Sequence, residues 1–205
     1  MNKLQLLQSL KEKGFSKQVI DAFAKIEREK FVPASLRERA YEDNPLPIGK
    51  GQTISQPNTT AIMLDLLELK KSQKILEIGS GSGYVLALMS TIVGSKGRIY
   101  GVEIVKELAE HSKKTLNNYK NIKIYNKSGK EGLKEEALFD RILISAAIEK
   151  IPRIILEQLK PNGLIVAPIG KFGVGQDLIL IQRKKDKFVI KKKISGFVFV
   201  KFVED

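Results

Sequence analysis

The stretch Lys74–Tyr84, KILEIGSGSGY, constrains the fold of this chain more than any other part of the sequence. Its first apolar residues, Ile75–Ile78, predict a buried strand that contains one carboxylate. Three glycines within the next five residues predict a turn with positive φ angles and no side chains at its closest approaches. The apolar run Tyr84–Val93 then predicts a helix packed on a sheet. A strand, a glycine-rich turn and a buried helix begin a nucleotide-binding β–α unit, which enzymes with several different cofactors share.

After this unit, predicted strands and helices alternate. The pattern favours an α/β fold, a doubly wound and mostly parallel sheet of the Rossmann-like type. Two later runs alternate apolar and polar residues across a charged turn and predict a C-terminal antiparallel hairpin. The predicted strands are Arg98–Val102 (ending at Glu103), Ile122–Tyr125, Phe139–Ser145, Leu164–Ile169, Asp177–Arg183, Phe188–Ile194 and the strand-like run Phe197–Val203, and the helices are Lys106–Tyr119 and Ile151–Leu159.

The segment before the glycine turn predicts N-terminal helices and a long loop. Residues 1–30 predict two helices. The first places Leu4, Leu7 and Leu10 on one face. The second is capped by Ser16, and its apolar residues recur at helical spacing: Val19, Ile20, Phe23, Ala24 and Ile26. Glu42–Pro57 reads as an ordered functional loop, because three prolines and two glycines accompany apolar anchors. Thr59–Leu69 predicts an amphipathic helix capped by Asn58.

Length and composition predict one domain without a membrane anchor. The chain has 205 residues and 42% hydrophobic content, enough for one core. We divide it into N-terminal helices and the long loop (1–57), a nucleotide-binding α/β core (58–170) and a C-terminal β extension (171–205). No run of 18 uncharged apolar residues is present, and the first residues lack the apolar centre of a secretion signal. We therefore expect a cytoplasmic protein that binds no membrane, and a monomer.

The residue types also limit the chemistry. The chain has no cysteine, which excludes disulfides, thiolate catalysis and a cysteine-bound metal. It has a single histidine, His111, so we do not expect a histidine-based metal site either. We read His111 as a surface or helix-packing residue. The net charge of +13 fits either a nucleic-acid or acidic partner or simply a lysine-rich, solvated surface, and the scattered basic residues favour the second reading.

Two glutamates flank the glycine turn. Glu103 follows the second strand, 24 residues after Gly79, where a carboxylate can accept hydrogen bonds from both hydroxyls of a ribose. Glu77 lies inside the first strand, where a buried charge requires a partner. That partner is either a nearby lysine or arginine or a positively charged group on the cofactor. The second reading favours a cofactor with an amino group or a sulfonium.

At this point the chain resembles a known family. LEIGSGSGY resembles the cofactor motif of class I S-adenosylmethionine-dependent methyltransferases, and YEDNPLPIGKGQTISQP resembles the substrate loop of protein-L-isoaspartate (D-aspartate) O-methyltransferases. FDRILISAA and LKPNGLIVAPIG are similar to later segments of the same family. The loop is the specific part, because the glycine turn is common to many methyltransferases. Order and spacing agree from about Phe31 to Gly170.

The resemblance implies an activity. A methyl group would pass from S-adenosylmethionine to the α-carboxylate of an isoaspartyl (or D-aspartyl) residue in a damaged protein, with S-adenosylhomocysteine as product and no metal. The ester would collapse to a succinimide and begin repair. Ser55 matches the catalytic serine and, with Asn58, would bind substrate. The residues that the resemblance, the two glutamates and strand order together assign to the cofactor are Thr53, Ile54, Gln56, Glu77, Gly79, Ser80, Gly81, Glu103, Ile104, Ser128, Gly129, Ser145 and Ala146.

The chain departs from the family pattern at two positions. Lys127-Ser128-Gly129 stands where members commonly have Gly-Asp-Gly, so Ser128 would meet the adenine without a charge. Asn58 stands where many members have histidine. Two alternatives therefore remain: a methyltransferase acting on nucleic acid or a small molecule, and a non-catalytic basic binding module. The sequence Ser145-Ala146-Ala147-Ile148 opposes amino-group methylation of nucleic acid, and the lack of cysteine opposes cytosine C5 chemistry, so nucleic acid is not the expected substrate.

Overall fold

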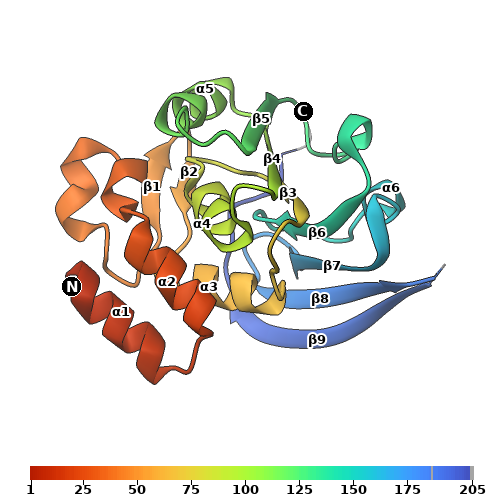
Figure 1. Ribbon diagram of the computed structural model, residues 1–205, viewed down its shortest axis with the longest axis horizontal. Coiled ribbons are helices and arrows are strands. Elements are labelled where there is room, and N and C mark those ends of the chain that lie inside the picture. The colour runs from red at the N-terminus through yellow and green to blue at the C-terminus, as the bar shows by residue number, and fades with distance from the viewer. Residues whose placement is uncertain (186, 204–205) are drawn as a thin grey trace.

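One seven-stranded sheet organises the computed structural model, which describes residues 1–185 and 187–203 (Figure 1). Its strand order is β5-β4-β3-β6-β7-β8-β9, with β3 to β7 parallel and β8 and β9 antiparallel. This confirms the predicted fold class. The strands are β3 (Lys74–Ile78), β4 (Arg98–Glu103), β5 (Ile122–Asn126), β6 (Phe139–Ile144), β7 (Leu159–Ile169), β8 (Gln176–Lys184) and β9 (Lys187–Phe197).

The central strand β3 lies where the strand order reverses. The chain runs outward from β3 through β4 to β5, and then returns to place β6 on the other side of β3. Ile75 thus pairs with Ile99 on one side and with Arg141 on the other. In open parallel sheets, ligands bind at the carboxyl ends of the strands beside such a reversal. The topology therefore predicts a binding site just beyond Ile78.

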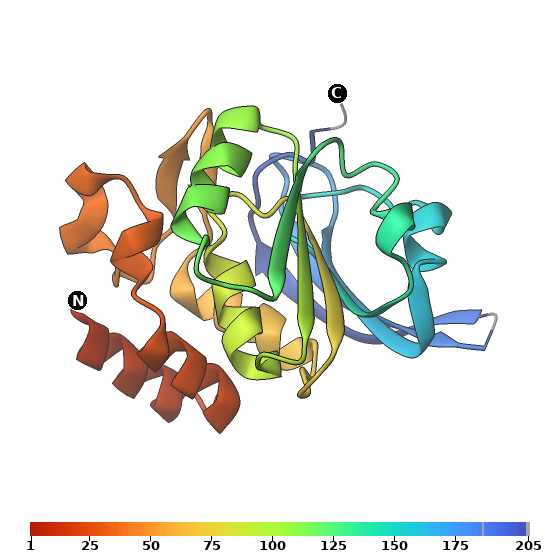
Figure 2. The ribbon, with the colours of Figure 1, turned by 45° about the horizontal axis from the view of Figure 1, so that its top comes forward.

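Helices cover both faces of the sheet (Figure 2). α3 (Pro57–Leu66), α4 (Tyr84–Val93) and α5 (Lys106–Thr115) lie on one face, and α6 (Arg153–Leu156) and the 3-10 turn η3 (Lys134–Glu136) lie on the other. α4 is buried along almost its whole length, as its apolar sequence predicts. Its bounds are those that the sequence predicts. Gly83 and Gly94, which flank it, have positive φ angles that interrupt the helix at both ends.

The N-terminal helices form an outer layer against α4. α1 (Lys3–Glu12) and α2 (Lys17–Lys25) are followed by the 3-10 turns η1 (Arg28–Phe31) and η2 (Ala34–Arg39). The predicted apolar face of α1 is wrong at one end, because Leu4 is 76% exposed while Leu6 and Leu10 are buried. In α2, likewise, Ala22 is buried and Ala24 is exposed. Ser16 does precede α2, but its hydroxyl donates to the Asp65 carboxylate at 2.5 Å instead of capping the helix.

The predicted loop Glu42–Pro57 contains a small hairpin. β1 (Leu46–Gly49) and β2 (Gln52–Ile54) pair antiparallel, and Leu46 and Ile54 are buried, so the segment is ordered and anchored as predicted but is not structureless. α3 begins at Pro57, which occupies the first helical turn, and Gln56 is its cap position. The predicted cap at Asn58 is therefore wrong. A proline there favours an early start, because its fixed φ suits the first turn of a helix.

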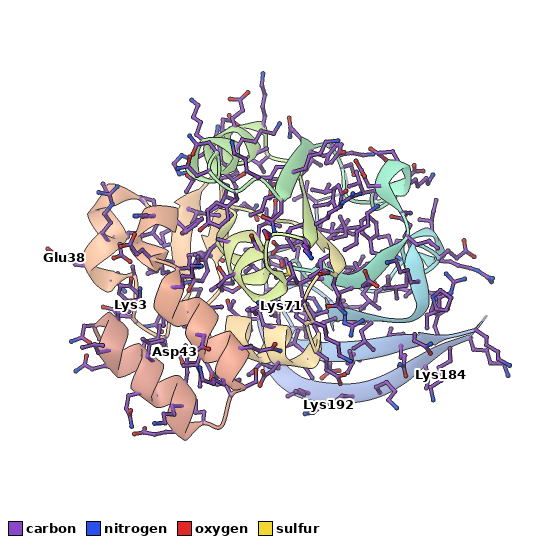
Figure 3. All side chains as sticks on the ribbon, in the orientation of Figure 1. Lys3, Glu38, Asp43, Lys71, Lys184 and Lys192 are labelled. Atoms are coloured by element: carbon purple, nitrogen blue, oxygen red, sulfur yellow. The ribbon has the colours of Figure 1, made fainter. Side chains whose placement is uncertain are left out.

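The C-terminal third differs most from the expected bounds. α6 has only four residues, and β7 begins at Leu159, where the sequence pattern predicts helix. β8 and β9 form the predicted hairpin, on which Lys184 and Lys192 are exposed (Figure 3). Residues 198–203 do not form the predicted further strand and make only one isolated bridge, Ala147 to Lys201. In the described residues, no helix is long and apolar enough to cross a bilayer.

Candidate active site

The glycine turn has the backbone conformation that its sequence predicts. Gly79, Gly81 and Gly83 have φ angles of 81°, 51° and 84°. The amides of Gly79 and Ser80 both donate to the carbonyl of Val102, at 2.8 and 3.1 Å, which ties the turn to β4. A Cβ at Gly81 would lie 3.2 Å from the Ile48 side chain of the hairpin. The Ile48 side chain therefore packs closely against the turn, and the glycines leave backbone without side chains facing a cavity.

A first cavity, which we call the cofactor cavity, lies beyond the carboxyl ends of β3, β4 and β6. It gathers eight of the predicted cofactor residues from five separate segments: Thr53, Gly79, Gly81, Glu103, Ile104, Gly129, Ser145 and Ala146. Five others do not line it. Ile54 and Glu77 are buried behind the wall, Ser80 has its hydroxyl directed toward Gly101, Ser128 lies beside Gly129, and Gln56 faces a second cavity.

The Glu103 carboxylate is held by the backbone at the rim of the cofactor cavity. One oxygen accepts from the amide of Gly81 at 2.7 Å, and the other accepts from the amide of Val105 at 2.8 Å. Burial raises the pKa of Glu103, and these backbone donors oppose that rise. Each carboxylate oxygen keeps a further lone pair, so the fixed side chain can still accept two hydroxyl donors. This geometry fits the ribose role that the sequence predicts.

Glu77 is 1% exposed and only half satisfied. Its Oε1 accepts from the Ser145 hydroxyl at 2.7 Å, while its Oε2 has no hydrogen-bond partner among the described residues. Burial raises the pKa of Glu77 to about 8, with a smaller upward contribution from Glu103 and a downward one from Ser145. No lysine or arginine of the described chain pairs with it. The structure therefore favours the reading in which a cationic group on a ligand partners this carboxylate.

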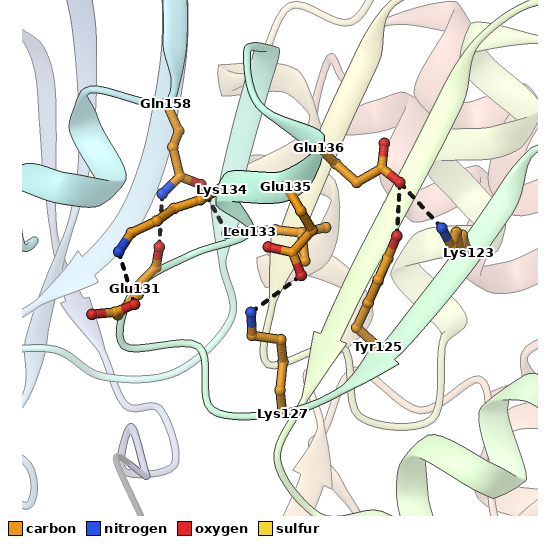
Figure 4. Close-up of polar contacts among 9 residues, drawn as sticks. All are labelled: Lys123, Tyr125, Lys127, Glu131, Leu133, Lys134, Glu135, Glu136 and Gln158. Carbon is orange, nitrogen blue, oxygen red and sulfur yellow. Dashed lines mark hydrogen bonds and ion pairs between the residues drawn. The ribbon is translucent and has the colours of Figure 1, made fainter.

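The segment that carries Ser128 and Gly129 is anchored by Gln158 (Figure 4). The Gln158 side chain accepts from the Leu133 amide at 2.8 Å and donates to the Glu131 carbonyl at 2.7 Å. Ion pairs and hydrogen bonds then fix the flanks of the segment, between Lys127 and Glu135, Lys134 and Glu131, and among Lys123, Tyr125 and Glu136. A Cβ at Gly129 would lie 2.3 Å from the Ile78 side chain, so only glycine fits there.

A second cavity, the acceptor groove, adjoins the cofactor cavity. It is lined by Ser55, Gln56 and Asn58 together with Pro45, Thr59, Ile62 and residues 196–199. Thr53, Ser145 and Val200 line both cavities. A ligand in one cavity can thus meet a ligand in the other at this junction, beside Ser55.

Asn58 is fixed by two charged neighbours at the edge of the acceptor groove. Its backbone amide donates to Asp43 at 2.8 Å, and its side-chain oxygen accepts from the Lys13 ammonium at 3.2 Å. Figure 3 labels Asp43 in the region of the N-terminal helices. Because an ammonium can only donate, the amide oxygen must face Lys13. The NH₂ group is then the donor that Asn58 can offer to a ligand in the groove, and the substrate-binding role of Asn58 stays a prediction.

Comparison with known proteins identifies the family. The sequence model described as Protein-L-isoaspartate(D-aspartate) O-methyltransferase (PCMT) matches residues 1–205. The chain belongs to this family. A protein-L-isoaspartate O-methyltransferase of Fervidobacterium nodosum is 45% identical over 197 residues, which cover 95% of this chain and 98% of that protein.

Two solved structures resemble this member of the family over its full fold. A protein-L-isoaspartate O-methyltransferase has a TM-score of 0.88 at 30% identity and covers 98% of this chain, which spans only 65% of that longer chain. A Plasmodium falciparum protein described as the same enzyme has a TM-score of 0.85 at 28% identity, with all of both chains covered, and was solved in complex with S-adenosyl-L-homocysteine. Members of this family use S-adenosylmethionine.

Several lining residues of this family member were not found from its sequence. Val200, Lys201, Phe202 and Val203 line the cofactor cavity, and residues 196–199 line the acceptor groove. The apolar run was visible in the sequence, but its pattern predicts a strand and not a cavity wall. His111 is exposed on α5 and lines a different cavity with Glu107 and Lys50, in agreement with the surface position expected for it.

Proposed function

We propose that this protein transfers a methyl group from S-adenosylmethionine to the α-carboxylate of L-isoaspartyl, and also D-aspartyl, residues in damaged proteins. Membership of the family supports the reaction. The observation that carries it in this chain is the junction at Thr53, Ser145 and Val200, where the cofactor cavity opens into the acceptor groove beside Ser55. Two ligands held in these cavities would meet without a covalent enzyme intermediate.

The cofactor side supplies binding and orientation. When bound, S-adenosylmethionine supplies an electrophilic methyl group on its sulfonium. Glu77 would hold the amino group through its free Oε2, and Glu103 would accept from the ribose hydroxyls. Ile104 would pack on the adenine, near Ser128 and Gly129. The backbone of Gly79, Ser80 and Gly81, together with Thr53, Ile54, Gln56, Ser145 and Ala146, would enclose the methionine portion.

The acceptor side needs positioning more than base catalysis. An aspartyl-type carboxylate is ionised at neutral pH, so it attacks without losing a proton. The Ser55 hydroxyl and the Asn58 amide would donate to one carboxylate oxygen and leave the other directed at the junction. Methyl transfer then depends on alignment at roughly 3–3.5 Å and on exclusion of water. Val198 and Val200, which line the groove, provide apolar walls for that purpose.

The product determines the biological consequence. The methoxy group of an isoaspartyl methyl ester leaves far more readily than the oxygen of the free carboxylate. The neighbouring amide nitrogen therefore attacks the ester carbonyl carbon, the bond to the methoxy group breaks, and methanol is released as a succinimide forms. Hydrolysis of the ring returns some normal aspartyl residue. The protein partners are accordingly damaged polypeptides, and repeated cycles would repair the backbone. A monomer remains our prediction for the oligomeric state.

The experiment that tests this proposal follows one isoaspartyl peptide through the reaction with S-adenosylmethionine. Mass spectrometry should detect a base-labile methyl ester, then a succinimide, then a mixture of aspartyl and isoaspartyl peptides. Ser55→Ala should fold normally and lower kcat by roughly 10- to 100-fold, because it removes one hydrogen bond to a charged group. No ester with the wild-type protein would contradict the function, and full activity of Ser55→Ala would contradict only the role of Ser55.

A further inference from the structure

Arg28, the first residue of η1, is a completely buried arginine that the sequence pattern does not single out. Its Nε donates to the carbonyl of Ala40 at 2.7 Å, and its Nη2 donates to the carbonyl of Ser55 at 2.8 Å. The two acceptors lie 12 and 27 residues further along the chain. One side chain thus connects the end of η2 to the residue that we place at the centre of the acceptor groove.

The same guanidinium lies against the start of the cofactor-binding helix. Its Cζ is 5.0 Å from the centre of the Tyr84 ring, and Tyr84 is the first residue of α4, directly after the glycine turn. Tyr84 is itself buried and packs against Phe23 and Phe31. Arg28 therefore contacts both the Ser55 segment and the element that follows the cofactor turn.

This arrangement is a costly way to fill a core. Burial lowers the pKa of Arg28, yet the guanidinium stays charged because its ordinary pKa is so high. Tyr84 and Asp43 favour the charged form and oppose that lowering of the pKa, but no carboxylate lies close enough to form an ion pair in the described chain. The geometric hydrogen bonds go to two backbone carbonyls, and Nη1 has no partner among the described residues. An apolar side chain would avoid the desolvation penalty. The guanidinium contributes what an apolar group lacks: two donors in a fixed planar fork.

The fork acts on the peptide group that follows Ser55. Ser55 lies between the last residue of β2 and Pro57, the first residue of α3, and is half-buried. Holding its carbonyl fixes the orientation of the Ser55–Gln56 peptide plane, and this restricts the backbone that carries the Ser55 side chain. Nothing else among the described hydrogen bonds is made to that carbonyl. Arg28 thus restrains the backbone position from which the Ser55 hydroxyl reaches into the acceptor groove.

We infer that Arg28 is a positioning residue for methyl transfer: its guanidinium fixes Ser55 in the acceptor groove relative to the glycine turn, through Tyr84. This inference rests on the proposed function. It assigns no contact between Arg28 and either ligand. Its effect is on alignment, and a misplacement of about 1 Å in the acceptor can lower a rate by roughly 100-fold.

Arg28→Lys is the variant that tests this role. A lysine keeps the charge, but its ammonium is a point donor and cannot hold two carbonyls in the geometry of the fork. We expect kcat for an isoaspartyl peptide to fall at least about tenfold. The Kd for S-adenosylhomocysteine, measured by calorimetry, should change less than about threefold, because the cofactor cavity is built from other residues.

Arg141→Lys is the matched control. Arg141 is also a buried arginine that donates to backbone carbonyls, those of Leu67, Glu68 and Asp140, but these lie at the opposite ends of α3 and β6 from the acceptor groove. A purely structural loss should lower the melting temperature in both variants. Only Arg28→Lys should lower kcat of the folded protein.

Arg28→Ala adds a chemical-rescue readout. Methylguanidinium at millimolar concentration should enter the vacated space and restore part of kcat, with no effect on the wild type or on Ser55→Ala. If Arg28→Lys keeps wild-type kcat, or if neither Arg28 variant loses more activity than its unfolded fraction explains, Arg28 is structural and the inference is wrong. An inactive wild type would instead refute the proposed function, so the two failures are distinguishable.

Discussion

Glu77 places a carboxyl group where water does not reach it. Burial raises its pKa to about 8, and the nearby Glu103 carboxylate adds to that rise. The ordinary value is 4.5, so the folded protein binds one more proton than the unfolded chain between pH 4.5 and about 8. This group therefore favours folding less and less as the pH rises through that window. A bound cation beside Oε2 would reverse the preference and ionise Glu77.

Cofactor binding should consequently release a proton near neutral pH. We predict that the affinity for S-adenosylhomocysteine increases between about pH 6 and 7.5 by up to about tenfold per pH unit, because its ammonium requires the ionised carboxylate. Calorimetry in two buffers of different ionisation enthalpy measures the released proton directly. Glu77→Gln, which mimics the protonated acid, should fold well, bind weakly and show a much flatter pH dependence. An unchanged slope in Glu77→Gln would show that another group titrates.

At the scale of elements, the segment between β5 and η3 presents Gly129 to the cofactor cavity without regular structure of its own. Gln158, only 4% exposed, replaces the missing backbone pairing by bonding Leu133 and Glu131 (Figure 4). A buried amide that loses such a partner costs about 1–3 kcal/mol. The position of Gly129 therefore depends on a side chain from the residue directly before β7.

Gln158→Ala should lower the free energy of unfolding by about 2 kcal/mol, because it leaves the Leu133 amide and the Glu131 carbonyl without these bonds. It should also weaken S-adenosylhomocysteine binding several-fold. Urea unfolding and calorimetry measure the two effects. The matched control is Lys127→Ala in the same segment, whose exposed ion pair with Glu135 contributes less than about 1 kcal/mol. Equal effects of the two substitutions would contradict the role of Gln158.

The sequence pattern predicted those helices and strands whose own residues carry the signal for their structure. β3, the glycine turn and α4 follow from apolar runs and glycines in the residues themselves. The hairpin within Glu42–Pro57 was missed because its strands are short: β1 has four residues and β2 has three. β1 also contains Pro47, and a proline weakens a strand pattern. Phe197–Val203 has a strand pattern, but beyond Phe197 it finds no neighbouring strand.

The candidate site residues were predictable in the same way, only where the local sequence carries a signal. Glu103 and Gly79 follow from spacing, and Ser55 from resemblance to the family. Arg28 and the cavity wall at Val200–Val203 were not predictable, because their roles arise only when distant segments meet. The same reason explains Ser16 and Leu4, whose partners or exposure depend on how α1 and α2 pack against α3 and α4.

At the scale of the whole molecule, the acceptor groove brings residues 45–62 together with residues 196–200, near the C-terminus. The β1–β2 hairpin and α3 form one side of it, and the end of β9 with the residues that follow it forms the other. Division of the chain into 1–57, 58–170 and 171–205 within one domain remains our proposal, and a single cooperative unfolding transition would support it. The charge of +13 is spread over many lysines, including those of the β8–β9 hairpin (Figure 3).

The most direct test of the central claim uses two peptides that differ only at one linkage, isoaspartyl in one and normal aspartyl in the other. Each is incubated with the protein and methyl-labelled S-adenosylmethionine, with transfer RNA as a further acceptor in a parallel reaction. The account predicts base-labile label in the isoaspartyl peptide and little in the normal peptide or the RNA. Equal labelling of both peptides, or label in RNA alone, would contradict it.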